Sequence, residues 1–225
     1  MEILLDSADP REVSEVAKQG LISGITTNPA LYAAQARGVS FVERLGELIE
    51  VSPGPVFTQV IGGNDCDAMI RQARWLTRQS DKIVVKIPMT EAGIRAVISL
   101  KRDSPSIKLA VTAVSSVAQA LLVGKAGADV VALFNGPLDQ VSDTPVEIVA
   151  PVRQIYSACG FNTKILSACR FPRGVGEYAA AGADMITLRR EYLDLLYEHP
   201  FTDKRVRGFA EDWAGAFGDA TWPQE

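Results

Sequence analysis

The sequence is poor in two residue types that many enzymes use as catalytic or ligating groups. Among 225 residues it has one histidine, His199, and three cysteines, Cys66, Cys159 and Cys169. The cysteines are odd in number, widely spaced and without a C-x-x-C pair, which argues against a disulfide framework or a zinc knuckle. His199 lies late in the chain, beside Pro200, which argues against Ser–His–Asp and Cys–His catalysis. We therefore expect a reduced, cytoplasmic protein.

Several other signals are also missing. No apolar run approaches the roughly 20 residues of a membrane span, and residues 1–6 do not resemble a signal peptide. The net charge of -4 gives no basic face for nucleic acid. The pair Gly62-Gly63 lacks the Lys-Ser/Thr of a P-loop, and no G-x-G-x-x-G opens a helix, so ATP and NAD are disfavoured. Metal-ligand clusters are absent as well, and we expect neither a metal nor a cofactor.

What the sequence does contain is a regular alternation of short apolar runs and longer amphipathic stretches. With 47% hydrophobic residues, the chain can form one large hydrophobic core without disulfide bonds. A short repeat, A-G-A-D at 126–129 and again at 181–184, precedes two of the runs. We expect eight strands, at residues 3–5, 24–26, 56–60, 83–87, 108–111, 130–134, 164–167 and 185–187.

Eight strands that alternate with helices predict an α/β protein with a (β/α)8 TIM barrel. An open, doubly wound sheet is the competing fold, because a count of strands does not show closure. We expect the barrel over residues 1–200, within a single-domain protein, and an extra helix in the tail 201–225. In that tail Val206, Phe209, Trp213 and Phe217 share one side of a helix over 202–218. This apolar side packs either on its own barrel or on a neighbouring subunit.

Barrel enzymes place their active sites at the carboxyl ends of the strands, so the polar residues there are the candidates. Lys86 is the most informative of the eight lysines, because it lies near the end of an apolar strand, I-V-V-K-I-P. Burial among apolar side chains lowers the pKa of an amine, and a neutral amine attacks carbonyl carbons to form a Schiff base. The alternative is a structural lysine that is ion-paired inside the barrel, for example with Asp6.

Asp6 directly follows the first expected strand and is a candidate proton acceptor, a helix cap or a salt-bridge partner. Cys169 has no histidine partner in the sequence and is better read as a small buried thiol than as a nucleophile. The remaining candidates at predicted strand ends are Thr26, Asn28, Gln59, Thr112 and Ser167.

These residues stand in motifs that resemble the transaldolase family, most closely the small subfamily with fructose-6-phosphate aldolase and short transaldolases. The resemblance covers essentially the whole chain. The run T-T-N-P followed by the V-K-I-P lysine is its most specific part. The matching runs are L-D-S-A-D at 5–9, G-I-T-T-N-P at 24–29, Q-V at 59–60, V-V-K-I-P at 84–88, T-A-V at 112–114 and D-W-A-G-A-F-G at 212–218.

The resemblance implies an enzyme that moves a dihydroxyacetone unit between sugars through a lysine imine, without a cofactor. It implies that Lys86 forms the imine with the donor ketose and that Asp6 takes the proton of the C4 hydroxyl. Gln59 and Thr112 are expected to hold a catalytic water. Asn28 and Thr26 are expected to bind donor hydroxyls and the lysine region.

The chain departs from the family pattern at the expected phosphate site. Phe134 occupies a position that is Phe in transaldolases and Tyr in the fructose-6-phosphate aldolases. Pro137 stands where the family has a phosphate-binding arginine. We expect Arg170 to take over the phosphate, with Arg173 in reserve, and Ser167 and Cys169 to line the substrate site. The change suggests an unusual donor or acceptor, in a specialised sugar pathway rather than the central pentose phosphate route.

Three functions remain open at this point. Phe134 favours transfer to an aldose phosphate, whereas Gln59 favours an aldolase that releases free dihydroxyacetone. A sugar-phosphate-binding barrel without catalysis is the third, and the complete set of catalytic residue types argues against it. The resemblance also implies a homo-oligomer, a ring of five or a decamer of two such rings, in which the C-terminal helix contacts a neighbour.

Overall fold

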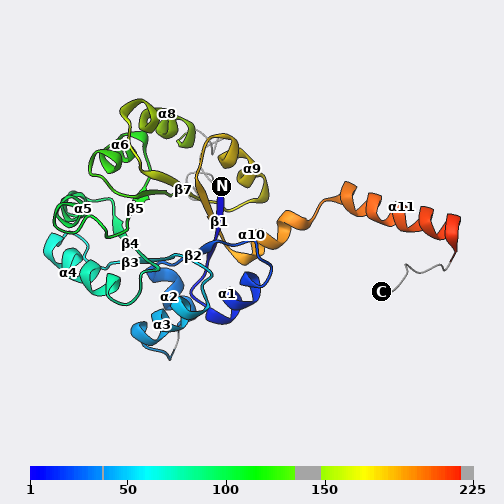
Figure 1. The fold of residues 1–225 in the computed structure, drawn as a ribbon, viewed down its shortest axis with the longest axis horizontal. Helices are drawn as coiled ribbons and strands as arrows, with labels where there is room; N and C mark the ends of the chain where they lie inside the picture. The colour runs from blue at the N-terminus through cyan, green and yellow to red at the C-terminus, as the bar shows by residue number, and fades with distance from the viewer. Residues whose placement is uncertain (37, 135–147, 219–225) are drawn as a thin grey trace.

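The computed structural model describes residues 1–36, 38–134 and 148–218 and shows a closed eight-stranded parallel barrel surrounded by helices (Figure 1). Each strand pairs with the next, and β1 pairs with β8, which closes the sheet and rules out the open doubly wound alternative. The strands are β1 (Glu2–Asp6), β2 (Gly24–Thr26), β3 (Val56–Gln59), β4 (Ile83–Pro88), β5 (Leu109–Val114), β6 (Val130–Leu133), β7 (Lys164–Ala168) and β8 (Met185–Leu188).

The helices follow the strands in the order that a (β/α)8 barrel requires. They are α1 (Pro10–Ala17), α2 (Pro29–Gln35), α3 (Phe41–Val51), α4 (Cys66–Thr77), α5 (Glu91–Asp103), α6 (Val117–Lys125), α8 (Val149–Cys159), α9 (Pro172–Ala180), α10 (Arg190–Asp194) and α11 (Pro200–Phe217). Several begin directly after a short polar residue, whose side chain caps a free backbone N–H. Asp9 caps α1 ahead of Pro10, and Thr90 and Ser116 cap α5 and α6. None of the helices in the described ranges is long and apolar enough to cross a membrane.

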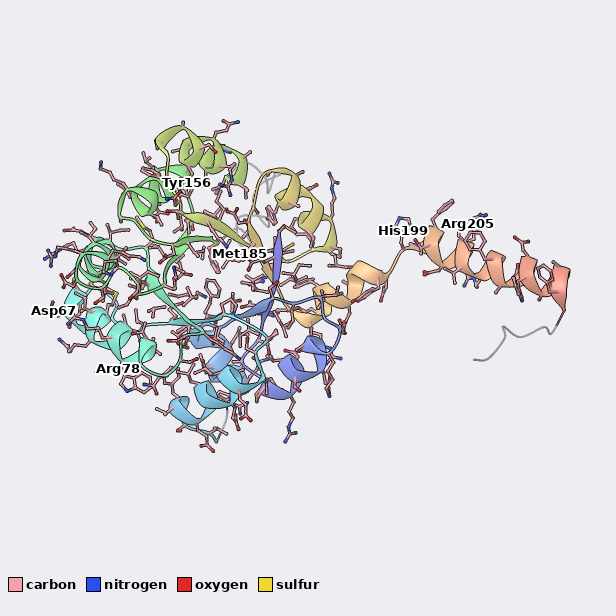
Figure 2. All side chains as sticks on the ribbon, viewed as in Figure 1. Asp67, Arg78, Tyr156, Met185, His199 and Arg205 are labelled. Carbon is pink, nitrogen blue, oxygen red and sulfur yellow. The ribbon has the colours of Figure 1, made fainter. Side chains whose placement is uncertain are left out.

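The strands bury both of their faces. One face packs against the surrounding helices in the main core, and the other fills the barrel with Leu4, Phe57, Val84, Ala110, Val130, Ala132, Leu166 and Met185. Figure 2 labels Met185 near the centre of the barrel. Because side chains alternate along a strand, the residue two positions beyond an interior residue also faces inward, one layer closer to the carboxyl ends. This alternation sets which side chains reach the active-site end.

The A-G-A-D repeat builds the opposite, amino-terminal end of the barrel. Asp129 accepts a hydrogen bond from the Leu109 backbone N–H at 2.8 Å, and Asp184 accepts one from Ile165 at 2.7 Å. Both aspartates also pair with a cation on a neighbouring helix, Lys101 or Arg153. The repeat therefore ties adjacent strands together at the end that serves stability.

Every expected strand except residues 24–26 differs from the observed strand by one to three residues at an end, and two of these differences bear on the site. Asp6 is the last residue of β1 rather than the residue after it, and β5 runs on to Val114 instead of ending at Val111. The pairing of β5 with β6 shifts register between Val111 and Val114. Within that shift Ala113 adopts a φ of 61°, a left-handed conformation that is strained for a residue with a Cβ atom. Such bulges re-aim side chains next to active sites.

Helix α11 leaves the barrel and buries none of its residues (Figure 1). It begins at Pro200, after His199, which caps it, and ends at Phe217. Figure 2 shows His199 and Arg205 well away from the barrel. Of the two ways to cover its apolar side, packing on its own barrel is therefore not the one adopted.

Candidate active site

A cavity of about 980 Å³ opens at the carboxyl ends of the strands. Its floor is the layer of side chains two residues beyond the apolar filling of the barrel. Six polar residues belong to this layer, and all of them line the cavity: Asp6, Thr26, Gln59, Lys86, Thr112 and Thr187. The strands therefore bring polar groups together at one end of an otherwise apolar barrel. Enzymes with this fold have their active sites at that end.

Lys86 lies in this layer with 7% of its surface exposed. Its Nζ atom donates a hydrogen bond to the backbone carbonyl of Thr27 at 2.8 Å. Burial lowers the pKa of the Lys86 amine to about 8, the nearby Arg170 lowers it further, and the Asp6 carboxylate acts in the opposite direction. At pH 7 about a tenth of such an amine is neutral, against about three in ten thousand for a free lysine. The amine is thus prepared for attack on a carbonyl.

Asp6, 5% exposed, is held by two polar groups, one of which is itself supported by a third. Thr26 Oγ1 donates to Oδ1 of Asp6 at 2.8 Å, and Arg170 Nη2 donates to Oδ2 at 3.3 Å. Thr187 Oγ1 lies 2.5 Å from Thr26 Oγ1. Because a hydroxyl has one proton, Thr187 donates to Thr26 when Thr26 donates to Asp6. A chain of hydroxyls therefore orients the carboxylate toward the cavity.

Lys86 does not form an ion pair with Asp6, so the structural alternative for this lysine is not realised. Its polar contact is a backbone carbonyl, and Asp6 pairs with Arg170 instead. A neutral amine can keep the hydrogen bond to Thr27, whereas it could not keep a salt bridge. This arrangement is compatible with a change of charge on Lys86 during a reaction.

Gln59 and Thr112 come from the strands on either side of Lys86. Gln59 is in register with Lys86, and Thr112 is in register with Pro88 on β4. Both line the cavity, together with the strained Ala113. An amide and a hydroxyl that flank an amine can hold a water molecule beside it, since each offers donor and acceptor atoms.

Asn28 and Phe134 also line the cavity. Asn28 caps α2, its Oδ1 accepting from the Leu31 backbone N–H at 3.0 Å, which leaves its amide NH₂ as a donor. Phe134 follows β6 with 45% of its surface exposed and puts an aromatic ring at the mouth. Pro137, the expected site of the lost arginine, lies outside the described residues.

Ser167 and Cys169 do not line the cavity, although the sequence places them at a strand end. The residues of β7 that line it are Leu166 and Ala168, so alternation turns Ser167 and Cys169 toward the helices. Both are fully buried. The thiol of Cys169 contacts the Phe171 carbonyl at 3.0 Å. Because they face the helices, these two side chains do not reach a substrate bound in the cavity.

The lining residues that were not foreseen from the sequence include Thr187, Arg189 and Arg190. These three lie at or just after the end of β8. A sequence signal was available, because Thr187 is the only polar residue of β8 and two arginines follow Leu188 directly.

The chemistry that this site can perform follows from its donor set. A buried amine, a carboxylate and two further polar side chains suffice for carbonyl addition and proton transfer. Within the described residues, no group of three or more His, Cys, Asp or Glu side chains is arranged to hold a metal ion.

Comparison with solved structures shows the same fold. The chain is similar to a structure titled "QR15, an Aldolase", with a TM-score of 0.59 and 14% sequence identity over 88% of this chain and 96% of that one. At that identity the likeness concerns the barrel alone.

Comparison of sequences reaches further. A "Probable transaldolase" of Kosmotoga olearia is 40% identical over 95% of this chain and 96% of its own length. A "Probable transaldolase" of Desulfitobacterium hafniense is 41% identical over 95% of this chain and 98% of its own. The family described as Transaldolase/Fructose-6-phosphate aldolase matches residues 3–219. The chain therefore belongs to the transaldolase/fructose-6-phosphate aldolase family.

Proposed function

We propose that this protein is a Schiff-base transferase that moves a dihydroxyacetone unit from a ketose phosphate donor to an aldose phosphate acceptor. The observation that carries the proposal is the buried Lys86 amine, with its pKa lowered to about 8, in the same side-chain layer as Asp6. Membership of an aldolase and transaldolase family supports it. Both the substrate class and the imine on Lys86 are part of what we propose.

In the first step the neutral Lys86 amine attacks the C2 carbonyl carbon of the donor. The carbinolamine loses water and leaves an iminium ion on Nζ. Water departs after a proton reaches its oxygen, and the water held by Gln59 and Thr112 is suitably placed to carry that proton. Lys86 gives up its hydrogen bond to Thr27 in this step, so no salt bridge has to be broken.

In the second step the Asp6 carboxylate takes the proton of the donor's C4 hydroxyl. The C3–C4 bond breaks, the C4 oxygen becomes an aldehyde, and the bonding electrons move into the iminium to give a neutral enamine. The hydrogen bond from Thr26 and the ion pair with Arg170 hold the carboxylate in position. Asn28 and Thr26 are the proposed contacts for donor hydroxyls, and Arg170 is a proposed phosphate contact.

In the third step the enamine carbon attacks the aldehyde of an acceptor, and protonated Asp6 returns its proton to the new alkoxide. Hydrolysis of the iminium then frees the product and Lys86. The competing fate of the enamine is protonation at carbon, which releases free dihydroxyacetone. Phe134 at the mouth has no hydroxyl to direct a water to that carbon, and this favours transfer.

The products decide between transfer and release. With fructose 6-phosphate as donor, we expect a new ketose when glyceraldehyde 3-phosphate is present and little free dihydroxyacetone. Dihydroxyacetone as the main product with acceptor present would support the aldolase reaction, which Gln59 favours. No consumption of the donor in either case would contradict both reactions.

Helix α11 supports the further proposal that the protein is a homo-oligomer, a pentamer or decamer. Its exposed side chains include Phe201, Phe209, Trp213 and Phe217, and the Trp213 and Phe217 rings contact each other with their centroids 4.6 Å apart. An 18-residue helix without a buried residue leaves its apolar side for a second copy of the chain.

A further inference from the structure

We infer that Arg189 is the residue that selects a phosphorylated acceptor, by binding the phosphate group at the β8 side of the cavity mouth. This inference rests on the proposed function and adds a specificity-determining residue to it. It starts from the cations that line the cavity in the described part of the chain, which are Lys86, Arg170, Arg189 and Arg190.

Three of these four cations are already engaged at short range. Lys86 donates to the Thr27 carbonyl at 2.8 Å, and Arg170 is bound to Asp6 and to the Cys169 carbonyl. Arg190 pairs with Glu15 at 2.6 Å and with Asp194 at 3.6 Å. A phosphate that recruited any of them would have to replace an existing partner.

Arg189 differs from the other three. Its ion pair, to Glu191, is 3.9 Å long, which is the longest among the ion pairs of the described residues. The Arg189 side chain remains 52% exposed, so its guanidinium keeps donors for an incoming anion. A guanidinium binds phosphate through two parallel N–H groups, which gives a strong and directional contact.

The position of Arg189 suits the far end of a sugar phosphate. Met185 belongs to the apolar filling and Thr187 to the polar layer. Arg189 keeps an extended backbone, with φ of -73° and ψ of 159°, and so continues the same inward face. Two residues of strand rise place it about 6–7 Å beyond the layer of Lys86 and Thr187. That distance matches the reach of a three- or four-carbon acceptor whose aldehyde lies at the reacting layer.

The sequence between β6 and α8 supplies no cation. Residues 135–147 contain neither lysine nor arginine, but they contain Asp139, Asp143 and Glu147. A cation that binds phosphate must therefore come from another part of the chain. The ends of strands seven and eight form the phosphate site in many barrels, and here they supply Arg170 and Arg189.

The test compares two acceptors of equal length, glyceraldehyde 3-phosphate and glyceraldehyde, in the full-length protein with fructose 6-phosphate as donor. We expect Arg189→Gln to lower kcat/KM for the phosphorylated acceptor about 10- to 100-fold, mostly through KM. The value for glyceraldehyde should stay within about threefold. Arg189→Lys should restore part of the loss, because the charge returns without the two-pronged contact.

Arg74→Gln is the matched control, since Arg74 lies on α4, is 50% exposed, pairs with Asp103 and does not line the cavity. It removes the same charge and should leave the ratio of the two kcat/KM values unchanged. An unchanged ratio in Arg189→Gln, or an equal loss with both acceptors, would overturn the inference while the proposed function stands. No turnover of either acceptor by the unaltered protein would overturn the proposed function, and the inference with it.

Discussion

Arg170 and Asp6, separated by 164 residues in the sequence, form an ion pair of 3.3 Å at the floor of the cavity. The same guanidinium lowers the pKa of Lys86, whereas the Asp6 carboxylate raises it. Arg170 therefore partly offsets the influence of Asp6 on the amine. The pair allows a carboxylate to share one small site with a lysine whose pKa is lowered by burial to about 8.

Replacing Asp6 with Asn separates imine formation from bond cleavage. The amide retains the shape of the carboxylate but cannot accept the C4 proton. We expect the variant to form the imine with donor and to turn over about 10²–10⁴-fold more slowly. Single-turnover kinetics alongside borohydride trapping measure the two steps. A normal adduct together with unchanged turnover would show that another group takes the proton.

The rate of imine trapping should depend on pH through Lys86. Only the neutral amine attacks, so the rate should rise with pH and level off above about pH 8, the lowered pKa of this group. Arg170→Ala removes a positive charge that lowers this pKa, so the midpoint should move to higher pH. Rates measured from pH 6 to 10 test both statements. A midpoint near 10.5, the ordinary value, would mean that Lys86 is not desolvated.

Phe134→Tyr tests the explanation for transfer. A hydroxyl on this ring can direct a water toward the enamine carbon and so favour its protonation. We expect release of free dihydroxyacetone to increase relative to transfer when donor and acceptor are both present. Phe134→Leu, which adds no hydroxyl, is the control. If both variants changed the product ratio equally, ring packing rather than the hydroxyl would control the enamine.

Removing α11 tests the proposed assembly. The full-length protein should sediment as an oligomer, because α11 buries none of its residues and exposes large apolar side chains. A chain that ends at Pro200 should lose the ring while keeping the circular dichroism of a barrel. A full-length protein that sediments as a monomer in dilute buffer would contradict the proposal.

Much of the barrel was predictable because the sequence patterns that indicate its strands and helices are local in the chain. The alternation of apolar runs and capped helices identified all eight strands, and parallel strands bring their carboxyl ends together. Lys86, Asp6, Gln59 and Thr112 could therefore be placed near one another without knowledge of their contacts. The closure of the sheet depends on the pairing of β1 with β8, which no local pattern contains.

The direction in which side chains face was harder to predict. Strands buried on both faces are apolar throughout, so their sequence does not reveal which residues point into the barrel. For this reason Ser167 was expected in the site, whereas Leu166 and Ala168 occupy it. The ion pair of Arg170 with Asp6 was missed for a related reason, since it depends on the long-range register that closes the barrel.

The central claim is that Lys86 carries the substrate as an imine. The most direct test is borohydride reduction in the presence of fructose 6-phosphate, followed by mass spectrometry of the intact protein and of its peptides. The account predicts one adduct, on Lys86, and none in Lys86→Met or Lys86→Arg, with the fold of both variants retained. An adduct on another lysine, or turnover that survives in Lys86→Met, would contradict it.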